Sequence, residues 1–211
     1  MAKVKITGHA SGSGVLTVTA PNTSTDRTIT LPDATGTLAT TGDITSYPIQ
    51  QTVTSNIGLG TGAVDSITTG DYNVGLGDSA LTATTTGAMN TAVGHLALGS
   101  NTEGSYNTAL GRASMQSNTT GTLNVAVGLA SLDANISGNN NVAVGKDAMY
   151  RNTTGSDNTA NGYQSLYNNT TAASNTSIGY GAMLANTTGA DNVAVGRQAL
   201  TSNTTAANNT A

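Results

Sequence analysis

An asparagine recurs with a 17-residue period through most of the chain, and this period constrains the fold more than any other feature. From Asn56 to Asn209 no insertion or deletion alters the spacing. Nine full copies in register indicate that each copy is one structural rung whose neighbours stack directly above and below it. The asparagines that open the second to ninth rungs are Asn73, Asn90, Asn107, Asn124, Asn141, Asn158, Asn175 and Asn192.

Other rung positions, counted from this asparagine as position 1, are as regular. Position 3 holds Gly, Ala or Ser, so we expect another stretch of backbone to approach closely there; position 9 holds Val, Leu or Met. Positions 1 to 4 and 7 to 10 predict two short strands, and an Asn-Thr-Thr-Gly sequence predicts a corner. Position 5 is always glycine, which predicts a positive φ at the other corner. These glycines, from the second rung, are Gly77, Gly94, Gly111, Gly128, Gly145, Gly162, Gly179 and Gly196.

The repeat predicts an all-β fold, a parallel β-solenoid or β-roll over residues 51 to 211, with nine repeats and the start of a tenth. A unit of this length is too short for a pair of helices and has no amphipathic helix. Aromatic residues are only 3% of the chain, without Phe or Trp, so the core must be thin. We therefore expect a trimer, and we expect the last rung to associate end to end or to fray.

The N-terminal segment before the repeats has a different composition. It holds all three prolines of the chain, Pro21, Pro32 and Pro48, and short alternating runs typical of strands. We interpret residues 1 to 50 as a small N-terminal β module and linker that serves for attachment.

Composition and motifs argue against several classes of function. Eleven acidic residues against seven basic ones, without a basic cluster, argue against nucleic acid as a partner. We expect no signal peptide, membrane span, metal or cofactor. The glycines of residues 58 to 62 imitate a dinucleotide-binding fingerprint, but the pattern recurs one period later as part of the repeat. No pair of catalytic groups recurs at one place, so we expect no enzyme.

The sequence resembles a known family in two places. Residues 90 to 94, Asn-Thr-Ala-Val-Gly, and 118 to 121, Asn-Thr-Thr-Gly, resemble repeats of bacteriophage tail-fibre-like proteins and, more distantly, the head repeats of YadA-type trimeric autotransporter adhesins. Residues 28 to 38 are similar to the N-terminal stretch of phage fibre proteins. The resemblance implies a homotrimeric fibre on the virion, with a β-roll in each subunit. The adhesin-head repeat is shorter than the rung of this chain, and we expect neither the export signal nor the membrane anchor that an autotransporter needs.

Tyrosines in neighbouring rungs form a candidate binding patch. Tyr150 and Tyr167 share one rung position, and Tyr163 and Tyr180 share another, with Lys146 and Arg151 close by. Such an aromatic strip with a basic edge could bind sugar faces or a partner protein. The alternative is that the stacked rings only stabilise the coil. In the same region Asn161 replaces the usual Val or Leu, and we expect its amide to need a partner.

We therefore predict a non-catalytic fibre shaft of a phage virion that contributes to host attachment or particle decoration. Its expected partners are two further copies of itself, tail or capsid proteins, and a host surface glycan or protein. An adhesin of the cell surface or a self-assembling extracellular filament is the alternative. A remote alternative is an ice-binding protein, because threonines such as Thr102, Thr119 and Thr153 form a file of hydroxyl groups at position 13.

Overall fold

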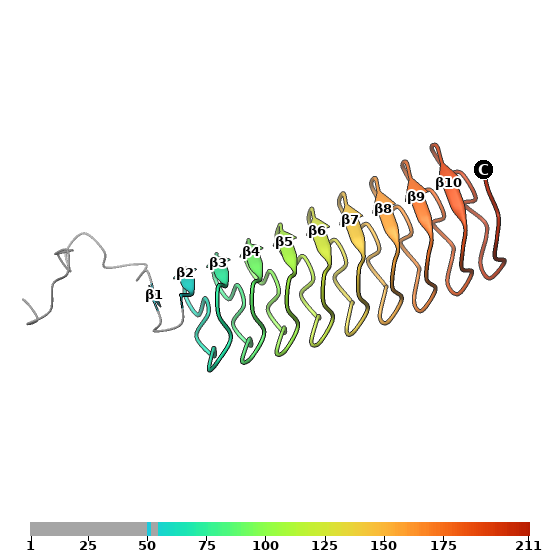
Figure 1. Cartoon of the computed structure of the whole chain (residues 1–211). Coiled ribbons are helices and arrows are strands. Elements are labelled where there is room, and N and C mark those ends of the chain that lie inside the picture. The colour runs from blue at the N-terminus through green and yellow to red at the C-terminus, as the bar shows by residue number, and fades with distance from the viewer. Residues whose placement is uncertain (1–49, 52–54) are drawn as a thin grey trace, which may run out of the picture. The chain divides into compact units, whose positions relative to one another are not determined.

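The computed structural model describes residues 50, 51 and 55–211 as a parallel β-solenoid of 17-residue rungs, as the repeat predicts (Figure 1). The predicted N-terminal module, residues 1 to 50, lies outside the described residues except for Gln50. The described part contains no helix, and so none that could cross a membrane. The strands are β1 (Gln50–Gln51), β2 (Ile57–Leu59), β3 (Val74–Leu76), β4 (Thr91–Val93), β5 (Thr108–Leu110), β6 (Val125–Val127), β7 (Val142–Val144), β8 (Thr159–Asn161), β9 (Thr176–Ile178) and β10 (Val193–Val195).

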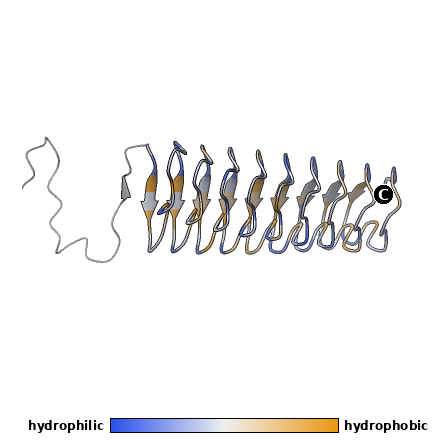
Figure 2. Ribbon diagram, turned by 90° about the horizontal axis from the view of Figure 1, so that it is seen from below, coloured by the Kyte–Doolittle hydropathy of each residue, from blue (hydrophilic) through white to orange (hydrophobic). Residues whose placement is uncertain are grey.

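One strand from each of the nine rungs, together with β1, forms a single ten-stranded sheet that runs along the solenoid (Figure 2). Strands β2 to β10 pair in parallel and in sequence order, while β1 pairs with β2 in the antiparallel sense. The register follows the period, so Val125 lies opposite Val142, and Val142 lies opposite Thr159. Equal rung positions therefore stack on one another.

Each of the strands β2 to β10 points one residue inward and two outward. Position 3 is buried in every rung, as at Ala126 and Ala143, while positions 2 and 4 are partly or fully exposed. Asn161 occupies position 4 and is exposed. Alternation along the strand sends this position to the outer side, where the amide is open to solvent, so the expectation that it needs a partner is wrong.

The second wall of each rung is a series of turns, so the second strand that we predicted there is wrong. Two residues of this wall, at positions 7 and 9, adopt left-handed backbone conformations, as at Asp147 (φ 56°) and Met149 (φ 50°). This backbone cannot be extended, but it still bonds to the next rung: the Met149 amide donates to the Ser165 carbonyl at 3.0 Å. The turns therefore stack with the same period as the strands.

The apolar core is one column of side chains between the two walls. The larger members come from position 9 of the turns and lie against the alanines of position 3 in the strands. A Cβ added to Gly75 at position 3 would lie 3.2 Å from the Ala80 carbonyl oxygen, so the walls approach closely, as expected. The fully buried members of position 9 are Leu81, Leu98, Met115, Leu132, Met149, Leu166 and Met183.

Two ladders of buried asparagines form hydrogen bonds within each rung and between neighbouring rungs. The position 1 side chain of Asn124 donates across its rung to the Gly138 carbonyl at 2.8 Å, and its Oδ1 accepts from the Asn141 backbone amide at 2.9 Å. A second ladder at position 12, which the sequence analysis treated as turn residues, is also buried. Asn135 of this ladder donates to Gly138 and to Asn118 Oδ1. These bonds satisfy the buried amides rung by rung.

Candidate functional site

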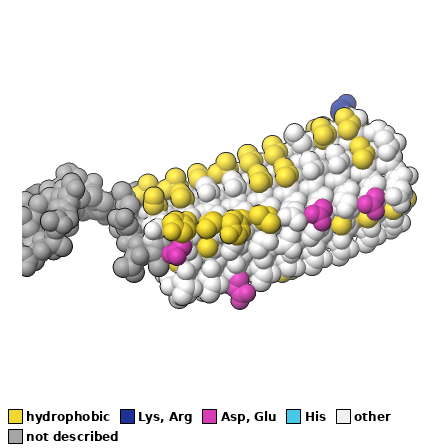
Figure 3. All heavy atoms as spheres, viewed as in Figure 1, with side chains coloured by type: hydrophobic (Ala, Val, Ile, Leu, Met, Phe, Trp, Pro, Cys, Tyr) yellow, Lys and Arg dark blue, Asp and Glu magenta, His cyan; other side chains and the backbone are white. Residues whose placement is uncertain are grey.

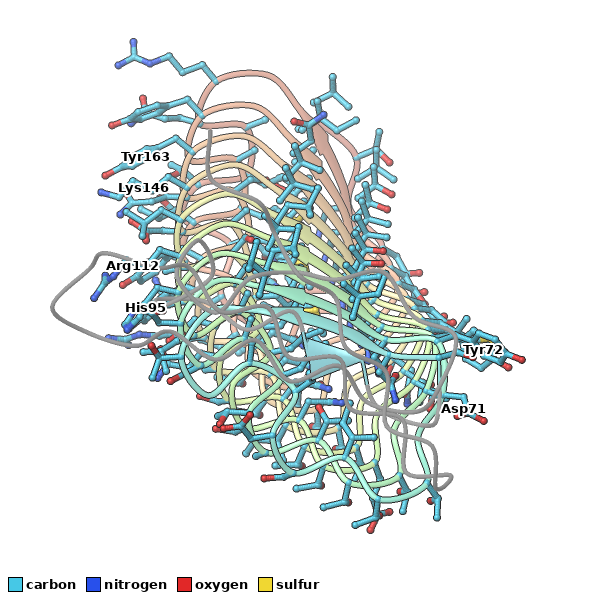
Figure 4. All side chains as sticks on the ribbon, turned by 90° about the vertical axis from the view of Figure 1, so that its left-hand side faces the viewer. Asp71, Tyr72, His95, Arg112, Lys146 and Tyr163 are labelled. Atoms are coloured by element: carbon cyan, nitrogen blue, oxygen red, sulfur yellow. The ribbon has the colours of Figure 1, made fainter. Side chains whose placement is uncertain are left out.

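One corner of the rungs gathers basic and aromatic side chains in a line. This corner is position 6, directly after the position 5 glycine that follows each strand. Glycine is required at position 5 because its φ is positive, 134° at Gly128. Figure 4 shows the labelled members on the same side of the solenoid, opposite Asp71 and Tyr72. We call this line the basic file; its members are His95, Arg112, Lys146, Tyr163, Tyr180 and Arg197, with Leu129 between Arg112 and Lys146.

Two tyrosines of the basic file form a stack that is closed by a cation at each end. The rings of Tyr163 and Tyr180 have centroids 5.2 Å apart and planes inclined by 28°. Lys146 Nζ lies 5.5 Å from the centroid of Tyr163, and the Arg197 guanidinium carbon lies 5.4 Å from that of Tyr180. Such cation–π contacts stabilise the stack and occupy the outer ring faces. Arg197 belongs to this cluster although the sequence analysis did not single it out.

The other tyrosine pair lies at position 10 of the rungs. Tyr150 and Tyr167 stack with centroids 5.3 Å apart and an interplanar angle of 8°, and the Arg151 guanidinium carbon lies 5.7 Å from the Tyr167 centroid. The ring contacts among the described residues join each pair internally and do not join the two pairs. The six residues of the candidate patch therefore form two parallel stacks rather than one strip.

The outer side of the sheet is a second candidate surface, and it is apolar. We call positions 2 and 4 of the nine strands β2 to β10 the outer sheet face; thirteen of its eighteen residues are Val, Leu or Ile. Val93, Leu110 and Val142 are each 37% exposed. Figure 3 shows hydrophobic side chains gathered in rows along the solenoid. This face is largely apolar and is interrupted at β8, where both outward residues are polar; an apolar face of this extent is suited to a protein partner.

Position 17, at the corner before each strand, changes character along the solenoid. It carries exposed apolar side chains in the early rungs, where Tyr72, Tyr106 and Leu123 stand, and acidic ones later, at Asp157 and Asp191. The early rungs therefore add apolar surface beside the outer sheet face, and the later rungs do not.

Asp133, at position 10 of the fifth rung, carries a partly buried carboxyl group. Burial raises the pKa of its carboxyl group, and the nearby Asp147 carboxylate raises this pKa further. Its Oδ1 is buried without a hydrogen-bond partner. The raised pKa bears on stability, because the folded chain holds this proton up to a higher pH than the unfolded chain does.

The threonine file at position 13 uses its hydroxyl hydrogens in bonds from one rung to the next. Thr102 Oγ1 donates to the Thr119 carbonyl at 3.2 Å, and Thr153 Oγ1 donates to the Thr170 carbonyl at 3.0 Å. Ile136 interrupts the file. These bonds give the threonines a structural role, which weakens the ice-binding alternative.

Metal-ligating residues and a phosphate-binding turn are the two remaining kinds of site. Within it, no three His, Asp or Glu residues lie together as a metal site would require. The glycines of residues 58 to 62 span strand β2 and the turns that follow it, instead of leading into a helix whose N-terminus could hold a phosphate. Comparisons with protein-family models, curated proteins and solved structures gave no match.

Proposed function

We propose that this chain is the non-catalytic shaft of a fibre, a homotrimer that projects from a phage virion and contributes to host attachment or to decoration of the particle. The observation that carries the proposal is the closure of every rung onto its neighbours. Because each buried asparagine bonds to the rung above or below, further rungs extend the rod by about 4.8 Å each without new kinds of contact. Such a rod serves as a spacer.

The outer sheet face supports the trimer. Its eighteen residues come close to the 20 to 30 residues, roughly, that each partner of a standard protein interface contributes. A thin core of alanines and one Val, Leu or Met per rung buries little apolar surface, so association of the outer faces would stabilise the fold. The number three and the virion come from the resemblance to phage fibre proteins.

Solution mass tests the proposal directly. We expect sedimentation or light scattering of the full chain to give three times the mass of the 20.9 kDa subunit. Changing Leu110 and Val142 of the outer sheet face together to lysine should give a monomer or unfolded protein, because six charges would meet at the trimer centre.

A matched control changes Thr120 and Thr154 to lysine, since these exposed residues lie in the same two rungs but away from the sheet. The control should remain trimeric. A wild-type chain that stays a folded monomer at all concentrations would contradict the proposal, and so would equal effects of the two double variants.

A further inference from the structure

The basic file concentrates the positive charge of the solenoid on one corner. The described residues include four Lys and Arg, and three of them, Arg112, Lys146 and Arg197, stand at position 6. His95, the one histidine of the described part, stands there as well. Of the acidic side chains in the described part, Asp78 alone stands at position 6 and the others lie at other rung positions, so positive charge gathers at this corner despite the net negative charge.

The positive groups of the basic file are available to a ligand. His95, Arg112 and Arg197 are exposed, and the Lys146 side chain is 52% exposed. Lys146 has an ion pair with Asp147, at 3.7 Å, and this is the one ion pair of the file among the described residues. An exposed pair of this length holds the ammonium group weakly. The file therefore presents cationic donors that lack strong internal partners.

The tyrosine stack decides what kind of ligand the basic file can take. Each of the two rings has one face against the other ring and the second face under Lys146 or Arg197. Their faces are therefore closed to the stacking of sugar rings or nucleic acid bases, which need an open aromatic face. What the file offers outward is a row of cations and the edges of two tyrosines, which are 37% and 49% exposed. This arrangement favours an anion over an aromatic or neutral ligand.

The spacing of the basic file suits an extended anion. Arg112 and Lys146 are two rungs apart, about 10 Å, and Lys146 and Arg197 are three rungs apart, about 14 Å, at a rise of about 4.8 Å per rung. The neighbouring positions 5 and 7 are glycine or mostly small and uncharged residues, so the file is a line one residue wide. A flat partner would touch little of it, but a linear polymer lying along the rod would meet several cations at once.

We propose that the basic file binds an acidic polysaccharide, a chain of sugars with carboxylate groups, that lies parallel to the axis of the solenoid. Arg112 and Arg197 donate paired hydrogen bonds to sugar carboxylates, and Lys146 contributes a third charge between them. Three equivalent files on a trimer would raise the avidity for a long chain. The inference rests on the proposed function, since it gives the fibre shaft a surface for attachment.

Binding of the full chain to polygalacturonate, with neutral dextran of equal length as reference, tests the inference. We expect salt-sensitive binding to polygalacturonate and none to dextran. Lys146→Gln should weaken binding about threefold, and the triple variant Arg112→Gln, Lys146→Gln, Arg197→Gln by tenfold or more. Arg151→Gln is the matched control, because it also removes one charge above a tyrosine but lies outside the file. It should bind as the wild type does.

Several outcomes would overturn the inference. These are absence of binding to polygalacturonate, equal binding to dextran, equal weakening by Lys146→Gln and Arg151→Gln, or tighter binding to single-stranded DNA. Solution mass and thermal unfolding of the same samples distinguish a failure of the proposed binding site from a failure of the proposed trimeric shaft. A trimer that does not bind the polysaccharide contradicts only the binding site, whereas a stable monomer contradicts the fibre shaft.

Discussion

The two walls of each rung reach the same stacking by different backbones. The strand wall, positions 2 to 4, is extended and pairs as a regular parallel sheet. The turn wall, positions 6 to 10, places non-glycine residues such as Asp147 and Met149 in the left-handed region. Left-handed residues cost about 1 kcal/mol or more each, so the turn wall carries strain that the strand wall does not. The strained wall supplies the large core side chains, and the relaxed wall supplies the small ones that receive them.

The glycine between the walls should be the most sensitive position. Gly128 has φ 134°, and a Cβ added there would lie 2.6 Å from the Gly145 carbonyl oxygen. We expect Gly128→Val to lower the free energy of unfolding by about 3 kcal/mol or more, measured by thermal or denaturant unfolding. Leu129→Thr, at the exposed residue next to it, should change it by about 0.5 kcal/mol or less. Equal effects would contradict the assignment of the corner.

The core contribution of the turn wall can be tested at Leu132. This side chain is fully buried and contributed by a residue with φ 53°. Leu132→Ala should cost about 2 to 5 kcal/mol of unfolding free energy, because it leaves a cavity between walls held apart by hydrogen bonds. Leu132→Met should cost less than about 1.5 kcal/mol, since Met115 and Met149 fill the same position in the adjacent rungs. A mild effect of Leu132→Ala would show that the walls collapse onto each other.

The two asparagine ladders should differ in sensitivity. Asn124→Ala removes the acceptor of the buried Asn141 backbone amide, which should cost about 2 to 3 kcal/mol. Asn135→Ala should cost less, because Thr84 and Ile67 occupy its position in other rungs, whereas position 1 is always asparagine. Denaturant unfolding of the two variants measures the difference, and a larger loss in Asn135→Ala would reverse our ranking.

The smallest effect should come from Asp133 in the turn wall, and it should depend on pH. Because the pKa of this carboxyl is raised in the folded state, the folded protein binds more protons than the unfolded chain between the ordinary Asp pKa and the raised value. Stability contributed by this group therefore falls as pH rises through that window. Asp133→Asn should raise the melting temperature at pH 7, and the gain should disappear below the ordinary Asp pKa. A gain that is independent of pH would contradict this account.

The sequence predicts the period, the strand wall and the position 5 corner, because stacking makes equal residues recur at equal positions. It could not predict the turn wall, since the left-handed conformations there belong to Leu, Met, Asp and Gln as well as glycine. These side chains do not favour a positive φ, so their presence in the sequence does not predict one. The same limit applies to Asn161, because Val, Leu or Ile at position 4 of the other rungs does not reveal that this position faces outward, where an amide needs no protein partner.

The candidate binding residues were predictable in part. Register alone predicts that Tyr150 stacks on Tyr167 and Tyr163 on Tyr180, and the ring distances agree. The closing of ring faces by Lys146 and Arg197 depends on side-chain directions at the corner, which the period does not determine. Arg197 could have been found by listing position 6 through all rungs, since it follows Tyr163 and Tyr180 in that file.

The central claim is that the shaft is a stack of equivalent rungs, each of which contacts only its neighbours. Removal of one whole rung tests this claim most directly. A variant without residues 124 to 140 lacks one full period and joins Leu123 to Asn141 in register, whereas one without residues 124 to 131 lacks only part of a rung and shifts the register. Each rung contacts only its neighbours, so we predict that the first variant unfolds within a few degrees of the whole chain. The second should unfold at a much lower temperature. Equal destabilisation by the two deletions would contradict the account.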